Sequence, residues 1–138
     1  MIGLSGTYEM YRTENFFDFL VACGAPAEKA SSIVEASCIQ HIEERENTIG
    51  VKIDSNHPFL NTPGMKEFSL TGHWEDMEDM HGKPVQYMST IEDNQIVHRF
   101  KDENGDILTS KRIKTSEGMK LELEKFGVES VHFFKASK

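Results

Sequence analysis

The sequence contains little of what a disulfide-stapled, metal-bound or membrane-spanning protein requires. Its 138 residues include two cysteines, four prolines and one tryptophan. Cys23 and Cys38 fit no metal-ligand spacing and form no disulfide framework, so we interpret them as reduced, small, buried apolar side chains. The mean hydropathy is −0.48, and no apolar run approaches membrane-spanning length. We therefore predict one soluble domain over residues 1–138, long enough to bury its own core.

The chain also has few positively charged residues. The chain has 15 lysines and arginines against 23 aspartates and glutamates, which gives a net charge of −8. This balance argues against nucleic acid as a partner and disfavours strong docking on anionic membranes. The start of the chain lacks the basic segment and apolar stretch of a secretory signal, although a secreted chain with its signal removed would look the same. We expect a monomer in the cytoplasm, with the nucleus as a further location.

The sequence also lacks motifs of catalysis. It has no Gly-rich phosphate loop, no nucleophile elbow and no paired catalytic carboxylates. Residues 73–81 contain many potential metal ligands, but they lack a tight motif such as H-E-x-x-H, and we interpret this stretch as a solvated acidic hairpin loop. We therefore predict that the protein is not an enzyme and holds no metal ion and no cofactor.

Two short helices are expected near the start of the chain. The first covers residues 15–24 and ends at Gly24, because one face carries three apolar residues at helical spacing, namely Phe16, Phe19 and Leu20. The second has Pro26 in its first turn and carries a modest apolar stripe made of Ala30, Ile33 and Val34. Together they predict a helix–turn–helix hairpin over about 15–36.

The rest of the chain has the pattern of short strands separated by turns. A first strand alternates from Leu4 to Met10, and a long series begins near Cys38. The expected strands of this series are 38–45, 49–54, 66–71, 85–92, 95–101, 106–114, 119–125 and 128–135. Strands at this spacing, joined by turns such as 93–94 and 126–127, predict an antiparallel barrel or sandwich.

Two basic side chains are expected on the same inner face. With two-residue turns at 116–117 and 126–127, Arg112 and His132 both lie across from Leu121, on strands two apart and roughly 10 Å from each other. Phe134 shares the face of His132, because side chains alternate along a strand. A buried arginine without a partner is costly, so this pair requires either an internal carboxylate or water and a ligand.

Several stretches of the sequence resemble the intracellular fatty-acid-binding proteins, and together they cover the chain without a large gap. In the opening signature of that family, an aromatic or aliphatic residue precedes x-G-x-[YW], and an N-[FY] helix start follows. The matching stretches here are Leu4–Tyr8, Glu14–Phe16, Phe19 with Leu20, Gly24, Phe59–Thr62, Phe68–Leu70, Lys111–Lys114 and Gly127 with Val128. The resemblance implies a flattened antiparallel up-and-down β-barrel of about ten strands, capped by the helical lid. Its interior cavity would hold a long-chain fatty acid or similar lipid.

The resemblance also assigns the residues around the ligand head group. In many members an arginine on one strand and an Arg-x-Tyr on the last strand hold the ligand carboxylate. The first arginine corresponds to Arg112, the second to His132 and the tyrosine to Phe134, so two of the three positions depart from the family pattern. Phe134 has no hydroxyl, and an imidazole with an ordinary pKa near 6.5 is only a conditional cation. A neutral His132 could hydrogen-bond a carboxylic acid, an alcohol, an amide or water.

By the same resemblance, four lid residues lie beside the ligand entry, namely Phe16, Phe19, Leu20 and Ile33. Phe59 corresponds to the loop aromatic that gates this entry. A purely structural role for these residues stays open, because phenylalanines at helical spacing usually belong to a core.

The expected function is that of a non-covalent intracellular carrier, which transports a long-chain fatty acid or related lipid with its head group near Arg112 and His132. The alternatives are a carrier of retinoids, bile-acid-like molecules or neutral lipid amides, and a signalling partner protein that depends on its lipid.

The charge of the lid predicts how ligand leaves. Segment 14–36 has a single basic residue, Lys29, against Glu14, Asp18, Glu28 and Glu35. An acidic lid is repelled by anionic bilayers, so we expect ligand to transfer through water. The rate of transfer of a fluorescent fatty acid should therefore not depend on the concentration of anionic vesicles. A rate that rises with vesicle concentration would contradict this expectation.

Overall fold

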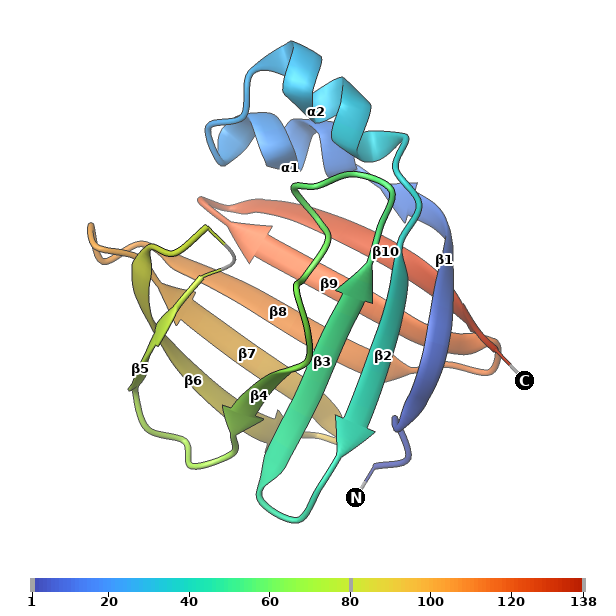
Figure 1. Ribbon diagram of the computed structural model, residues 1–138, viewed down its shortest axis with the longest axis vertical. Helices are drawn as coiled ribbons and strands as arrows, with labels where there is room; N and C mark the ends of the chain where they lie inside the picture. Colours follow the sequence, from blue (N-terminus) through green and yellow to red (C-terminus); the bar gives the residue numbers. More distant parts are fainter. Residues whose placement is uncertain (1, 80, 138) are drawn as a thin grey trace.

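Ten strands among the described residues pair antiparallel into one sheet, which curls into a flattened barrel (Figure 1). The computed structural model describes residues 2–79 and 81–137, so residues 1, 80 and 138 of the expected domain lie outside the described residues. The strands are β1 (Gly6–Glu14), β2 (Ile39–Glu44), β3 (Thr48–Asp54), β4 (Lys66–Ser69), β5 (Glu75–Glu78), β6 (Pro84–Glu92), β7 (Gln95–Lys101), β8 (Ile107–Lys114), β9 (Gly118–Lys125) and β10 (Val128–Ala136). The predicted antiparallel up-and-down barrel is confirmed.

Neighbours in the sheet are also neighbours in the sequence, apart from β1 and β10, which pair with each other. The order runs from β4 back to β1, and then from β10 back to β5. From the end strand β4, the backbone N–H of Ser69 donates to the hydroxyl of Tyr87 on β6 at 3.1 Å. A side-chain hydrogen bond therefore joins the end strand β4 to β6, which is the neighbour of the other end strand, β5.

Tight turns set the register of two hairpins, β6–β7 and β9–β10. Two hairpin turns have both central residues at positive φ, which is the type I′ geometry that matches the twist of paired strands. These residues are Asp93 (52°), Asn94 (61°), Phe126 (55°) and Gly127 (75°). Arg112 and His132 both pair with Leu121, as predicted. The alternation of buried residues along β10 places Ser130, His132 and Phe134 on the inner face.

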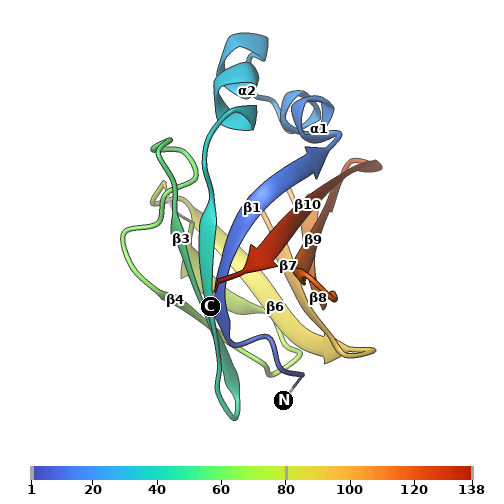
Figure 2. The same ribbon diagram turned by 90° about the vertical axis from the view of Figure 1, so that its right-hand side faces the viewer.

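Two helices, α1 (Phe16–Ala22) and α2 (Ala27–Val34), cover one end of the barrel, opposite the N-terminus (Figure 2). Pro26 stands just before α2 as its N-cap instead of in its first turn, and its φ of −59° suits the entry into a helix. The inner faces of the two helices form a lid cluster, whose buried members are Phe16, Phe19, Leu20, Ala30 and Ile33. No helix among the described residues is long and apolar enough to cross a membrane.

A second apolar cluster fills the barrel itself. This barrel cluster consists of Leu4, Tyr8, Cys38, Ile42, Ile49, Val51, Phe68, Tyr87, Ile96, Met119, Leu121 and Phe134. Leu123 is partly buried and packs against both the barrel cluster and the lid cluster. The interior is therefore lined by apolar side chains at both ends, and its polar residues stand out against them.

The sequence pattern placed some strands incorrectly. Residues 75–78 form the short strand β5, whereas the sequence pattern predicts a solvated loop over residues 73–81. Only Met77 of this strand packs against the barrel cluster, and the charged residues around it are the kind that protect an edge strand, so the apolar alternation is too weak to see. In addition, β1 extends to Glu14 instead of ending at Met10, and β4 ends at Ser69 instead of residue 71. The prediction that both cysteines are buried is wrong for Cys23, which is exposed where the first helix of the lid ends, and holds for Cys38.

Strands β9 and β10 approach each other closely at Gly118, and this contact allows a test of the fold. A Cβ atom there would lie 2.5 Å from the backbone N of Ala136 and 2.7 Å from the carbonyl O of Phe134, neither of which can move independently of β10. We expect Gly118→Ala to lower the free energy of unfolding by about 2 kcal/mol or more, measured by urea denaturation. Gly64→Ala is the matched control, because nothing lies within 4 Å of its added Cβ. Equal stability of the two variants would refute the close approach.

Candidate functional site

The buried polar side chains form a set that an all-apolar core would not contain. They are Gln40, Thr62, Ser89, His98, Ser110, Arg112, Ser130 and His132. Most of them come from strands on different sides of the barrel, namely β2, β6, β7, β8 and β10. Buried polar groups are costly unless they are hydrogen-bonded, so their partners indicate what the interior can bind.

Arg112 is the charged centre of this set. Its side chain is buried, and the residue is only 6% exposed. Its Nε donates to Oε1 of Gln40 at 3.1 Å, and its Nη1 donates to Oγ of Ser110 at 3.4 Å. None of the ion pairs between described residues involves Arg112.

The charge of Arg112 is therefore uncompensated within the described part of the chain. Burial lowers the pKa of the guanidinium to about 10, which still leaves it protonated at neutral pH. Burying an unpaired cation costs several kcal/mol, and an anion beside it would recover part of that cost. The sequence predicts that Arg112 and His132 face either an internal carboxylate or water and a ligand. The described residues supply no carboxylate partner for Arg112, so the alternative of water and a ligand remains.

His132 lies two positions from Ser130 on the same inner face. Ser130 Oγ donates to the carbonyl of Glu14 at 3.1 Å and lies 3.1 Å from Nε2 of His132. A serine hydroxyl has one proton, and here the carbonyl accepts it, so Nε2 must carry the proton of the imidazole and Nδ1 is an acceptor. Burial, together with the positive charge of Arg112, lowers the pKa of His132 to about 4. At neutral pH the imidazole is uncharged.

The lid reaches this site through Phe16. Its ring meets the ring of His132 edge-on, with the centroids 4.4 Å apart and the planes at 80°. Phe19, Leu20 and Ile33 are buried with Phe16 in the lid cluster, whereas Phe134 belongs to the barrel cluster. The structure thus brings Phe16 directly against His132, and the other three lid residues pack with Phe16 in the lid cluster.

Phe59 lies in the loop between β3 and β4, where it is partly buried against the lid cluster. Lys29 Nζ of α2 sits 4.6 Å from its ring centroid, and the ring of His81 is 5.2 Å away. Hydrogen bonds hold this loop to the lid, since Ser32 Oγ lies 3.1 Å from Nε2 of His57. Phe59 therefore lies where the lid, its own loop and the segment after β5 meet.

His98 is a buried polar residue that the sequence reasoning missed. Its Nδ1 lies 2.6 Å from Oγ of Ser89, and the two residues pair directly across β6 and β7. Burial and the charge of Arg112 lower the pKa of His98 to about 3, so the ring is neutral. The turn at 93–94 carries the signal that was overlooked, because it sets Ser89 opposite His98 and so puts both on the face of Arg112.

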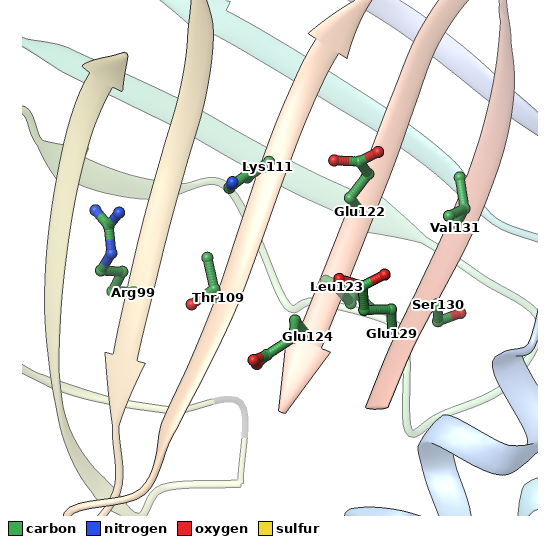
Figure 3. Close-up of a pocket in the computed structure, with 9 residues that line it drawn as sticks. All are labelled: Arg99, Thr109, Lys111, Glu122, Leu123, Glu124, Glu129, Ser130 and Val131. Atoms are coloured by element: carbon green, nitrogen blue, oxygen red, sulfur yellow. The ribbon is translucent and has the colours of Figure 1, made fainter. Parts of the chain in front are cut away.

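A pocket of about 370 Å³ lies elsewhere, on the wall formed by β7–β10 (Figure 3). It is lined by Arg99, Thr109, Lys111, Glu122, Leu123, Glu124, Glu129, Ser130 and Val131. Most of these residues alternate with the inward-facing ones on their strands, so their side chains project from the outer face. A lining this rich in charge does not suit an apolar chain. Within residues 2–79 and 81–137, no group of three or more His, Cys, Asp or Glu side chains could hold a metal ion.

Solved structures with the same architecture are found among lipid-binding proteins. Fatty-acid-binding protein 1 of Echinococcus granulosus matches with a TM-score of 0.83 and 16% identity, over 100% of both chains. A fatty-acid-binding protein from brain tissue of Drosophila melanogaster matches with a TM-score of 0.78 and 21% identity, over 97% of this chain and 100% of that one. This chain has the fold of the fatty-acid-binding proteins.

The fold is not confined to proteins with that description. The wild-type fluorescent protein UnaG matches with a TM-score of 0.81 and 21% identity, over 96% of each chain. No family model matches the chain, and no curated protein matches it either. At these identities the comparisons establish the fatty-acid-binding-protein fold, and the ligand has to be inferred from the side chains.

The two buried histidines predict how stability depends on pH. Their ordinary pKa is 6.5, and the folded values are about 3 for His98 and about 4 for His132. Below pH 6.5 the unfolded chain binds a proton at each ring and the folded chain does not, so stability is complete above pH 6.5 and is lost as pH falls toward 4. We expect the free energy of unfolding to drop by about 2 kcal/mol per histidine between pH 6.5 and pH 5.

Urea denaturation at several pH values measures this drop. His98→Leu removes one of the two groups, so about half of the change should disappear. His73→Gln is the control, because His73 is exposed and its replacement should leave the pH dependence unchanged. A wild-type stability that is flat over this range would show that the imidazoles are not buried in the neutral form.

Proposed function

We propose that the protein is a non-covalent carrier of a long-chain fatty acid or a closely related lipid, bound inside the barrel with its head group near Arg112. The observation that supports this proposal most directly is a buried guanidinium whose described partners are all neutral. A fatty-acid carboxylate supplies the missing negative charge. The apolar residues of the barrel and lid clusters supply the surface against which an alkyl chain can be buried.

The binding free energy would come mainly from the chain, and the head group would set the orientation. Burial of apolar surface contributes roughly 25 cal/mol per Å², so a long alkyl chain outweighs any single polar contact. A charge-assisted hydrogen bond to Arg112 adds about 1.5–3 kcal/mol, and it is available only to a ligand with an acceptor at that end. In this proposal Phe16, Phe19, Leu20, Ile33 and Phe59 line the route of entry.

A second candidate is a carrier of lipids with a neutral head, such as amides or retinoids. Two observations favour it. His132 is neutral and presents Nδ1 as an acceptor, and Phe134 has no hydroxyl to donate to a carboxylate. A lipid with an N–H or O–H at its head would satisfy His132, whereas it would leave the charge of Arg112 uncompensated, so we rank it second.

Neither candidate requires catalysis. In both, the protein acts as a monomer that moves lipid through the cytoplasm, and release of ligand requires the lid to separate from the loop around Phe59. The buried residues assigned to the site act only by binding and orienting.

Lipids extracted from the purified protein and identified by mass spectrometry provide the test. Long-chain fatty acids should be present in the wild type and depleted at least tenfold in Arg112→Ala, because one charge-assisted hydrogen bond corresponds to about one to two orders of magnitude in affinity. Arg99→Ala is the matched control, since Arg99 lies on the adjacent strand, on the outer wall, paired with Glu92. It should retain the full amount.

The other outcomes separate the candidates. Neutral amides or retinoids at similar levels in the wild type and in Arg112→Ala would favour the second candidate. A folded wild type that carries no lipid, and that takes up none from a panel of fatty acids, would reject carriage of lipid altogether. That outcome would favour the alternative of a signalling partner protein.

A further inference from the structure

The neutral ring of His98 has a hydrogen-bond partner at only one of its two nitrogens. Ser89 occupies Nδ1, while Nε2 is buried and has no hydrogen-bond partner among the described residues. The residue is 1% exposed. A buried polar atom without a partner is rare in folded proteins, and it calls for an explanation such as a water, an ion or a ligand group that completes the hydrogen bonding.

Aromatic rings surround His98 and supply no hydrogen bond. The centroid of Phe68 is 4.6 Å from that of the imidazole, and the centroid of Phe100 is 5.9 Å away. The side chain of Tyr87 packs edge-on against Phe68, and its hydroxyl accepts from the backbone N–H of Ser69. Among the described residues, this hydroxyl makes no hydrogen bond to Nε2 of His98. An apolar ligand would leave Nε2 without a partner.

The position of His98 relative to Arg112 limits the ligand. His98 pairs with Ser110 across β7 and β8, and the same Ser110 accepts a hydrogen bond from Nη1 of Arg112. Directly paired residues of an antiparallel sheet have their Cα atoms about 4.5–5.5 Å apart. A carboxylate beside Arg112 would therefore have its first few carbons close to His98.

The hydrogen-bonding chemistry of Ser89 and His98 determines which ligand group can bind Nε2. The hydroxyl of Ser89 can either donate to Nδ1 or accept from it, so Nε2 can be the acceptor or the donor of the second bond. A ligand hydroxyl can take either role, whereas a carbonyl can only accept. A second carboxylate would have to be desolvated beside a neutral ring, which is costly.

We propose that His98 and Ser89 form a second polar subsite, which selects fatty acids that carry a hydroxyl on the first carbons after the carboxylate. This inference rests on the proposed function and deepens it, because it names the subclass of lipid. The carboxylate lies beside Arg112, the hydroxyl bonds Nε2 of His98, and the rest of the chain is buried as in an unsubstituted acid.

Isothermal titration calorimetry with four ligands tests the subsite, namely palmitic acid and its α-hydroxy, β-hydroxy and ω-hydroxy derivatives. We expect the α- or β-hydroxy acid to bind the wild type about tenfold more tightly than palmitic acid, which corresponds to one hydrogen bond to a buried group. The ω-hydroxy acid is the isomeric control and should show no gain, because its hydroxyl lies at the far end of the chain.

His98→Leu should bind palmitic acid and lose the preference for the hydroxy acid. His41→Leu should keep that preference, since His41 contacts Asp54 and Thr7 and lies outside the buried polar set. Should His98→Leu fail to fold, the ¹⁵N resonance of His98 Nε2 in the wild type provides a second measurement. It should shift with the preferred hydroxy acid and not with palmitic acid.

The outcomes distinguish this inference from the function on which it rests. Equal affinity for all four ligands would leave the fatty-acid carrier standing and overturn the subsite. A preference for the hydroxy acid that survives in His98→Leu would also overturn it. Failure of palmitic acid and every derivative to bind would reject the carrier and the subsite together.

Discussion

The interior of this protein depends on one constraint, the burial of a guanidinium and of several neutral polar groups away from water. The charge of Arg112 adds to burial, which is the larger cause, in lowering the pKa of both His98 and His132. It also orients Gln40 and Ser110 so that their oxygens face its N–H groups. Because like charges repel, a barrel with one buried arginine can hold imidazoles nearby only in their neutral forms. The interior therefore combines one fixed positive charge with several groups that can donate or accept.

The lid is tied to this interior. Phe16 belongs to the lid cluster, and its ring contacts the ring of His132 directly. On the other side of the lid, Ser32 contacts His57 in the loop that carries Phe59. A lipid that displaced either ring would therefore disturb contacts of both the lid and the barrel. In this sense the apolar packing of the helices and the polar set beneath them form one structural unit.

The antiparallel all-β class and the inward position of Arg112 could be predicted from the sequence because they depend on local rules, whereas the choice of a barrel over a sandwich came from the family resemblance. Two-residue turns fix the parity of the strands that they join, and so Arg112 and His132 could be placed opposite Leu121 without coordinates. The strand β5 could not be found in this way, because Met77 is its single residue in contact with the barrel cluster.

Other features of the site depend on contacts that no local rule provides. The bond from Arg112 to Gln40 joins residues 72 positions apart, across the barrel from β8 to β2. The contact of Phe16 with His132 depends on how the lid sits on the barrel. The low pKa values of the histidines follow from burial, and burial depends on the whole fold. His98 is an intermediate case. The turn at 93–94 predicts that its side chain faces the interior of the barrel. The lack of a hydrogen-bond partner at its Nε2 depends on the whole fold and could not be predicted.

The pairing of β1 with β10 has a consequence for the order in which the chain folds. Every other pair in the sheet joins consecutive strands, which can form as soon as each hairpin is made. The pair of β1 and β10 joins the two ends of the chain, so it has the largest loss of chain entropy on closure. During synthesis, β1 has β2 as its neighbour long before β10 emerges. Until then one edge of β1 is unpaired, and the half of the sheet from β1 to β4 exposes its inner face to solvent. The last strand to be made therefore both closes the barrel and delivers His132 to Arg112, so that barrel and site are completed in the same step.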